Sequence, residues 1–168
     1  AALTVSSPAA RSKKIGDVLF SSLNDVAVAF ENAVEAQSDW QAKALDERAR
    51  VCENIADQLE SHRSELLYLL QLEAGKTLVD SIDEIREAVD FCRYYAQQAR
   101  RVCAPTEFTG YTGEKDEMTL VGRGVVVCIS PWNFPVAIFT GQVVAALVVG
   151  NAVIAKPAEQ TNLLASRV

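Results

Sequence analysis

Histidine is nearly absent from this sequence, and its cysteines match neither a zinc spacing nor a CxxC redox pair. The four cysteines, Cys52, Cys92, Cys103 and Cys128, are separated by 40, 11 and 25 positions. The single histidine, His62, opens a predicted helix, where we expect it at the surface. We therefore predict no metal site, and we expect the reducing setting of the cytoplasm.

Clustered positive charge and membrane-spanning runs are missing as well. The 16 basic side chains are outnumbered by 22 acidic ones, for a net charge of -6, and they form no nucleic-acid footprint. The longest apolar stretch, 136–149, is shorter than the roughly 20 residues that cross a bilayer. The N-terminal string "AALTVSSPAARSKK" lacks the order of a signal peptide. With 49% apolar residues, the chain is expected to form a globular core, with no nucleic-acid partner and no transmembrane segment.

Helical periodicity dominates between residues 23 and 102. Apolar residues keep to one face in four predicted helices, at about 23–40, 45–60, 61–75 and 79–102. The predicted caps are Asn24 and Asp25 for the first helix, Ser61 for the third, and Thr77 or Asp80 for the fourth. Gly75 is expected to adopt the left-handed conformation where the third helix ends.

The pattern changes at Pro105. Residues 105–124 alternate apolar and polar positions around two glycines, which predicts a pair of short strands. The string "GVVVCIS" is a continuous apolar run, which predicts a strand covered on both faces. A helix from Pro135 to near Gly150 and a strand in "NAVIAKP" complete a βαβ unit, the start of a parallel sheet.

The surroundings of this unit indicate a larger protein. A sheet of two parallel strands cannot cover itself, and "EQTNLLASRV" begins another helix as the sequence ends. Gly122 and Gly124 form a GxG that precedes a strand instead of following one, so they predict a turn and not a phosphate-binding loop. We therefore expect the first part of a larger α/β protein.

Asn133 stands between Pro131 and Pro135, directly after the first strand of the unit. The prolines restrict the backbone at the carboxyl end of that strand, where ligands bind in open α/β sheets. The amide would then be a preorganised hydrogen-bond donor. A turn asparagine that bonds to its own backbone is the alternative, and spacing alone does not separate the two.

The string "SPWNFP" is followed, 23 residues after its asparagine, by the lysine of "AKPAEQT". Together these strings resemble the aldehyde dehydrogenase superfamily. "REAVDFCRYYAQQAR" and "GRGVVVCISPWNFPVAIFTGQ" resemble its glutamate-semialdehyde (1-pyrroline-5-carboxylate) dehydrogenases, and the likeness covers nearly the whole chain. It implies the N-terminal part of the aldehyde dehydrogenase α/β fold, a helical layer followed by the first βαβ unit of a Rossmann-like parallel sheet. The implied divisions are a mainly helical segment at 1–104, an oligomerisation-type hairpin at 105–124 and a truncated dinucleotide-binding sheet at 125–168.

The resemblance implies an NAD-dependent oxidation in which a cysteine thiolate attacks the aldehyde. Asn133 is similar to the asparagine whose side-chain amide stabilises the oxyanion. Lys156 and Glu159 resemble the pair that holds the ribose hydroxyls of the cofactor's adenosine. The remaining implied contacts are the backbone of Ser130, Pro131 and Trp132 for the cofactor cleft, and Phe134 and Ile138 for the aldehyde tunnel. The implied partners are an aldehyde substrate, the rest of the dehydrogenase polypeptide and further copies in a homo-oligomer.

Cys128 lies close to Asn133 in the sequence, but it stands within an apolar strand, where burial raises the pKa of a thiol. Core packing is therefore the favoured interpretation. The family's cofactor loop, general base and nucleophilic cysteine have no counterpart in these 168 residues, so we expect no turnover by the chain alone. A free-standing binding or interaction module derived from a truncated dehydrogenase is the alternative.

Overall fold

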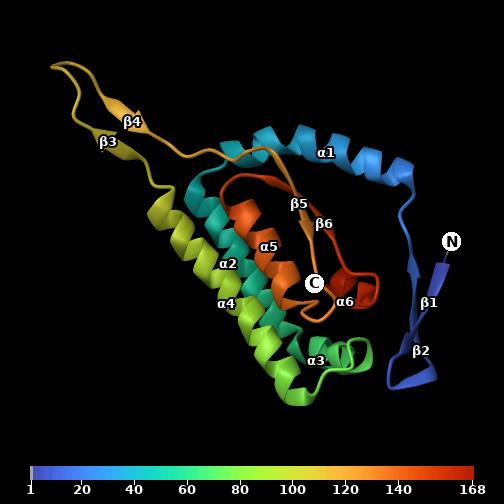
Figure 1. Ribbon diagram of the computed structural model, residues 1–168. Coiled ribbons are helices and arrows are strands. Elements are labelled where there is room, and N and C mark those ends of the chain that lie inside the picture. Colours follow the sequence, from blue (N-terminus) through green and yellow to red (C-terminus); the bar gives the residue numbers. More distant parts are fainter. Residues whose placement is uncertain (1) are drawn as a thin grey trace.

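The computed structural model describes residues 2–168. After an N-terminal hairpin, four helices come first along the chain, and a second hairpin and a βαβ unit follow them (Figure 1). The elements are β1 (Ala2–Ser7), β2 (Ala10–Leu19), α1 (Leu23–Ala42), α2 (Leu45–Ser61), α3 (Arg63–Leu72), α4 (Leu78–Val102), β3 (Thr106–Phe108), β4 (Asp116–Met118), β5 (Val125–Ile129), α5 (Ala137–Val148), β6 (Ala152–Lys156) and α6 (Asn162–Arg167). The four helices predicted between residues 23 and 102 are present. None of the helices in the described residues is long and apolar enough to cross a membrane.

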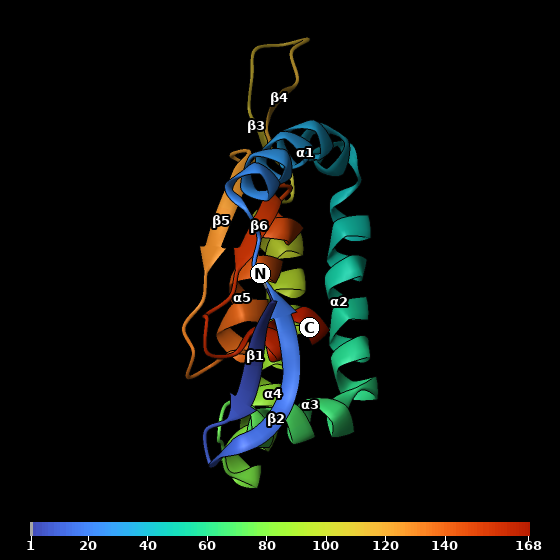
Figure 2. The ribbon, with the colours of Figure 1, turned by 90° about the vertical axis from the view of Figure 1, so that its right-hand side faces the viewer.

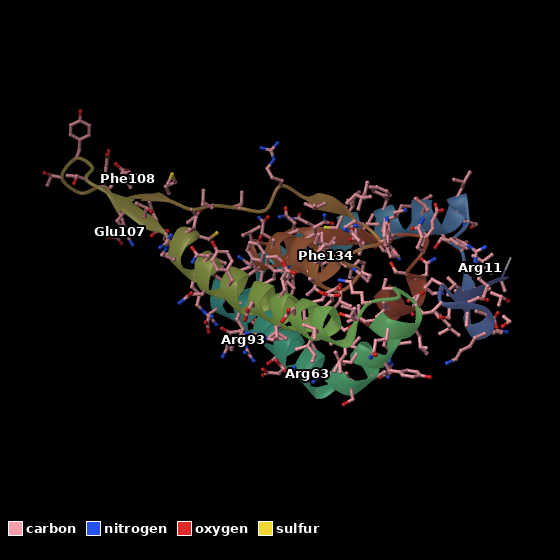
Figure 3. The ribbon with its side chains drawn as sticks, turned by 60° about the horizontal axis from the view of Figure 1, so that its bottom comes forward. Arg11, Arg63, Arg93, Glu107, Phe108 and Phe134 are labelled. Atoms are coloured by element: carbon pink, nitrogen blue, oxygen red, sulfur yellow. The ribbon has the colours of Figure 1, made fainter. Side chains whose placement is uncertain are left out.

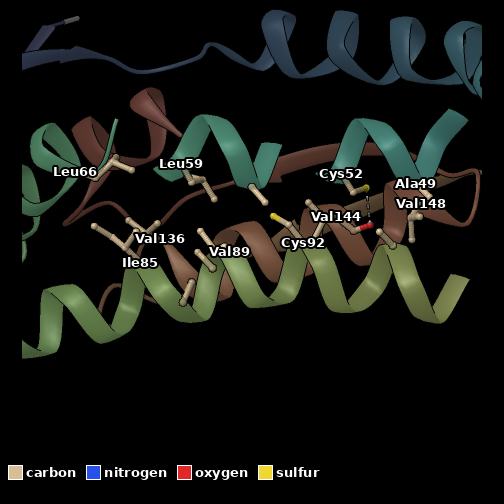
Figure 4. Close-up of a cluster of buried hydrophobic side chains, with 14 of the residues drawn as sticks. Ala49, Cys52, Leu59, Leu66, Ile85, Val89, Cys92, Val136, Val144 and Val148 are labelled. Atoms are coloured by element: carbon tan, nitrogen blue, oxygen red, sulfur yellow. Dashed lines mark hydrogen bonds between the residues drawn. The ribbon is translucent and has the colours of Figure 1, made fainter. Parts of the chain in front are cut away.

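The core lies where α2, α4 and α5 pack together (Figure 4). Small side chains alternate with larger ones along the inner face of α4, where Ala88, Cys92 and Ala96 are fully buried. Small residues let helix backbones approach closely, and the larger side chains fill the space between them. The larger buried side chains of this cluster are Leu59, Leu66, Leu70, Ile85, Val89, Val136, Val144, Val148 and Leu164. The helical layer and α5 therefore share one core.

β5 and β6 form the predicted parallel pair, with Val125 opposite Ala152 and Ile129 opposite Lys156. They run between α5 and α1 (Figure 1). The prediction that β5 is covered on both faces is wrong within residues 2–168, because Val127 is 45% exposed and Ile129 is 67% exposed. α1 lies mainly over β6 and buries none of its own residues, so one face of β5 stays open.

An antiparallel hairpin of β1 and β2 begins the described chain and was not predicted from the sequence (Figure 2). Most of its residues are exposed and half of them are polar, so they carry little of the period-two apolar pattern that identifies a strand. The hairpin contacts the other end of the chain, because a Cβ at Gly16 would lie 3.0 Å from Leu163 Cδ1 in α6.

The second hairpin, β3 and β4, forms as predicted, with Thr106 opposite Met118 and Phe108 opposite Asp116. It projects away from the helices, and Glu107 and Phe108 stand near its base (Figures 1 and 3). All residues of both strands are exposed. Its role in oligomerisation stays a prediction.

Helix boundaries match the prediction more closely than the caps do. Ser22, not Asn24, caps α1, in a capping box with Asp25. Ser61 does not cap α3; it ends α2, and its Oγ donates to the carbonyl of Gln58 at 2.9 Å. Thr77 caps α4 as predicted. Gly75 has the expected positive φ of 67°, two residues before that cap.

Candidate functional site

The carboxyl ends of β5 and β6 bring the two predicted cofactor segments together. The Ser130 amide donates to the carbonyl of Lys156 at 3.1 Å, which extends the parallel ladder by one bond. Ser130 is buried, and its hydroxyl lies 3.4 Å from Gln142 Oε1 in α5. The loop after β5 and the loop after β6 therefore leave the sheet side by side. This is the edge at which open α/β sheets bind ligands.

Asn133 lies in the loop between β5 and α5, and its side chain is exposed. No side-chain hydrogen bond within residues 2–168 involves this amide. A turn asparagine would be expected to bond to nearby backbone, so the geometry favours an amide that is free to donate to a ligand. Pro135, which follows two residues later, is buried and anchors the loop against the core.

The helix after this loop has no cap of its own, and a residue from the helical layer supplies one. α5 has neither an N-cap side-chain bond nor an acidic residue in its first turn. Glu84 of α4 is buried, and its Oε1 accepts from the amides of Val136 at 2.8 Å and Ala137 at 3.3 Å. A carboxylate at a helix N-terminus satisfies free amides and suits the helix dipole.

Lys76 completes this arrangement from the loop before α4. Its Nζ forms an ion pair with Oε2 of Glu84, and the side chains are 14% and 0% exposed. The same Nζ lies 4.3 Å from the centroid of the Phe134 ring, within cation–π range. Phe134 lies where the sheet loop meets the helical layer (Figure 3). Ile138 follows in the first turn of α5 and is half-buried.

Sequence reasoning missed Lys76 and Glu84. The available signal was the position of Glu84 on the apolar face of α4, between the buried residues Ser81 and Ala88. A carboxylate in such a stripe needs a partner. The sequence does not show that the amides of Val136 and Ala137, more than 50 positions away at the start of α5, are partners of Glu84.

Lys156 is the last residue of β6, Glu159 follows in the loop after it, and both residues are exposed. Neither forms an ion pair with another residue in the part of the chain that the structure describes. The carbonyl of Glu159 accepts from Asn162 Nδ2 at 2.9 Å, which fixes the backbone of this loop while leaving the carboxylate open. An ammonium donor and a carboxylate acceptor at this edge suit a pair of vicinal hydroxyls, so these residues fit an adenosine ribose.

Trp132 lies on a cleft away from the other predicted site residues. It lines a cleft of about 440 Å³ together with Glu73, Thr161 and the tip of the β1–β2 hairpin. The other predicted site residues do not line this cleft. Glu73 is buried there and caps α6, accepting from the amides of Leu163 at 2.8 Å and Leu164 at 2.7 Å.

The three buried cysteines, Cys52, Cys92 and Cys128, are poorly suited to act as nucleophiles. Burial raises the pKa of Cys52 to about 11 and that of Cys92 to about 12, so both thiols stay protonated near neutral pH. Burial also raises the pKa of Cys128, whose side chain faces the core as the favoured interpretation expected. All four cysteines are free.

The sequence matches the model of the aldehyde dehydrogenase family over residues 1–168, and the chain belongs to that family. It is 46% identical over 144 residues to the bifunctional protein PutA of Salmonella typhimurium, which covers 86% of this chain and 10% of that protein. It is 34% identical over 160 residues to 1-pyrroline-5-carboxylate dehydrogenase 2 of Bacillus subtilis, which covers 95% of this chain and 31% of that protein. The chain therefore spans about a tenth to a third of these relatives.

Solved structures confirm the predicted fold class. A 1-pyrroline-5-carboxylate dehydrogenase from Thermus with bound NAD superposes with a TM-score of 0.93 at 36% identity, covering 99% of this chain and 33% of that one. A proline utilization A (PutA) structure with proline bound in remote sites gives a TM-score of 0.87 at 46% identity, covering 89% of this chain and 16% of that one. The helical layer and the first βαβ unit thus match the N-terminal part of aldehyde dehydrogenase structures.

Proposed function

We propose that this chain is the segment of an NAD-dependent dehydrogenase that supplies the oxyanion donor and half of the adenosine-ribose site. The proposed reaction oxidises L-glutamate γ-semialdehyde to glutamate in proline catabolism. One observation carries the proposal: Asn133 presents an exposed amide with no hydrogen-bond partner within residues 2–168, at the carboxyl edge of a parallel sheet. The relatives named as PutA and 1-pyrroline-5-carboxylate dehydrogenase support the choice of substrate.

The residues of this chain would act by binding and by electrostatic stabilisation. Attack on the aldehyde places negative charge on its oxygen, and the Asn133 amide donates a hydrogen bond to that oxygen. Lys156 donates to the ribose hydroxyls and Glu159 accepts from them, while the backbone of residues 130–132 lines the cofactor cleft. Phe134 and Ile138 shape the path of the aldehyde. NAD, when bound, accepts the hydride that leaves the substrate carbon.

The nucleophile and general base belong, in this proposal, to the rest of the dehydrogenase polypeptide. The raised pKa values of the buried thiols support that assignment. The β3–β4 hairpin, which projects from the helices, is proposed to serve a homo-oligomer. Four free cysteines support a cytoplasmic setting.

The test is turnover by the complete dehydrogenase that contains this segment. With glutamate semialdehyde and NAD, Asn133→Ala should lower kcat by roughly 10²- to 10³-fold, the usual cost of one oxyanion donor, and leave the KM for NAD nearly unchanged. Asn24→Ala, at an exposed asparagine of α1, is the matched control and should keep the kcat of the parent enzyme. An Asn133→Ala enzyme with normal kcat and lower thermal stability would make Asn133 a turn-former and overturn the proposal.

A further inference from the structure

Lys76 has two partners that belong to different elements. Its ammonium pairs with the Glu84 carboxylate, which accepts from the amides of Val136 and Ala137 at the start of α5. The same ammonium lies 4.3 Å from the centroid of the Phe134 ring. Asn133 is the residue directly before Phe134. Lys76 therefore holds the chain just after Asn133 at two points. One is the Phe134 ring, and the other, through Glu84, is the start of α5.

From these contacts we infer that Lys76 is a positioning residue for Asn133, acting through Glu84 and Phe134. The inference rests on the proposed function, because it assigns Lys76 to the same oxyanion site. Lys76 does not touch the reacting atoms in this assignment. It sets the direction in which the Asn133 amide points.

The burial of these groups makes the contact rigid. The Glu84 side chain is fully buried and that of Lys76 is 14% exposed, so water competes little for either charge. The buried Pro135 leaves the loop little freedom between the ring and the helix. Trp132, Asn133 and Phe134 are exposed, so the orientation of Asn133 depends on the contact of the Phe134 ring with Lys76 and on the buried start of α5.

A Lys76→Met variant removes the ammonium and keeps a side chain of similar length. It also leaves the Glu84 carboxylate buried without its cation, which lowers stability for a reason unrelated to Asn133. A second variant, Lys76→Met with Glu84→Gln, removes both charges. The side-chain carbonyl of the introduced glutamine can still accept from the amides of Val136 and Ala137, so this double variant separates stability from positioning.

We expect Lys76→Met to lower kcat by about 10- to 100-fold in the complete dehydrogenase, the scale of a misplaced catalytic group, with an unchanged KM for NAD. The double variant should recover thermal stability but keep the low kcat, because the cation at Phe134 is still missing. The exposed pair Lys43 and Glu47, at 2.9 Å, provides the control, and Lys43→Met with Glu47→Gln should match the parent enzyme in both assays.

A kcat that returns to normal together with stability would overturn the inference, since Lys76 would then be a structural residue only. Combining Lys76→Met with Asn133→Ala tests the route through Asn133. The combined kcat should fall little below that of Asn133→Ala alone, because residues that act as a unit are not additive. If Asn133→Ala has normal kcat while Lys76→Met lowers it, the proposed function fails and Lys76 acts by another route.

Discussion

Two buried carboxylates of the helical layer, Glu73 and Glu84, each accept from two backbone amides at the start of a later helix. Their surroundings differ, because Glu84 has the Lys76 cation beside it. Burial raises the pKa of Glu73 above its ordinary value, against the lowering effect of the Leu163 and Leu164 amides. The buried charge of Glu84 is therefore compensated by a cation, whereas Glu73 is held by backbone amides.

The raised pKa of Glu73 predicts a pH dependence of stability with a definite sign. The unfolded carboxyl ionises near its ordinary pKa of about 4.3, before the folded one does, so ionisation favours the unfolded chain. The contribution of this group is present below the unfolded pKa and is lost as the pH rises through the folded one. Denaturation between about pH 4 and about pH 7 should show the parent losing stability relative to Glu73→Gln as the pH rises.

Glu65 is the control for this measurement, because its pKa is lowered by its hydrogen bonds to Arg167. As the pH rises, the parent should therefore gain stability relative to Glu65→Gln. The gain should be small, since the Glu65–Arg167 pair is exposed to water. Parallel pH profiles of Glu73→Gln and the parent would show that burial of Glu73 does not shift its titration.

The proposed ribose contacts of Lys156 and Glu159 predict a defect in cofactor binding alone. Each charged hydrogen bond contributes about 1.5–3 kcal/mol, so Lys156→Ala or Glu159→Ala should raise the KM for NAD about 10- to 100-fold. The kcat at saturating NAD should stay near that of the parent enzyme. Lys115→Ala, in the loop of the β3–β4 hairpin, is the matched control. An unchanged KM in both site variants would remove the ribose assignment.

At the scale of elements, α5 is held at both ends by other helices. Glu84 holds its N-terminus, and at its C-terminus Arg48 Nε donates to the Val148 carbonyl at 3.1 Å and Trp40 Nε1 to the Leu147 carbonyl at 2.8 Å. α5 has no basic residue in its own last turn. The charges supplied from outside have the signs that a helix dipole favours.

We predict that Arg48→Met destabilises the fold by about 1.5–3 kcal/mol, because it leaves buried carbonyls at the ends of α1 and α5 without their charged donor. Chemical denaturation measures this loss. Arg50→Met, two positions along α2, removes an equally large cation whose side chain is 64% exposed, and it should change stability little. Equal effects of the two variants would mean that the buried donor of Arg48 contributes nothing beyond its packing.

The elements that the sequence predicts well are those whose pattern is local. α4 follows from its apolar period, and β5, α5 and β6 follow from two apolar strands around an apolar helix. That helix begins at Ala137, so the predicted start at Pro135 is two residues too early. The β1–β2 hairpin was missed although its pairing is local, because its mostly exposed residues carry little of the alternating apolar pattern that identifies a strand. The prediction that both faces of β5 are covered was wrong, because one face is exposed within residues 2–168. An apolar run indicates that a strand is suited to burial, but it does not show which neighbour covers each face.

The candidate site likewise has residues that the sequence identifies and residues that only the structure identifies. Asn133, Lys156 and Glu159 stand out in short strings, and the Ser130–Lys156 hydrogen bond shows that the two strings meet at one edge of the sheet. Lys76 and Glu84 depend on how the helical layer packs against the sheet, so no short string shows them. Their roles emerge only from distances between elements.

At the scale of the whole molecule, apolar surface remains on several elements. Leu23 is 90% exposed and Val34 is 63% exposed on α1, and Ile129 is 67% exposed on β5. β5 and β6 each have one strand partner within residues 2–168, so both outer edges of this sheet present free backbone groups. Surfaces of this kind promote association when they stay uncovered.

We therefore predict that the 168-residue chain, purified by itself, self-associates and binds a hydrophobic dye. Light scattering should give a mass above the 18.2 kDa of one chain, increasing with concentration. Replacing Val34 and Ile129 together by lysine should reduce both association and dye binding, because these positions are exposed and their loss removes no core contact. Lysine at Thr4 and Ser12, which are exposed but polar, adds the same charge without removing apolar surface, and it should change association less. A monodisperse monomer that binds no dye would contradict the prediction and favour a chain that is self-sufficient as a binding module.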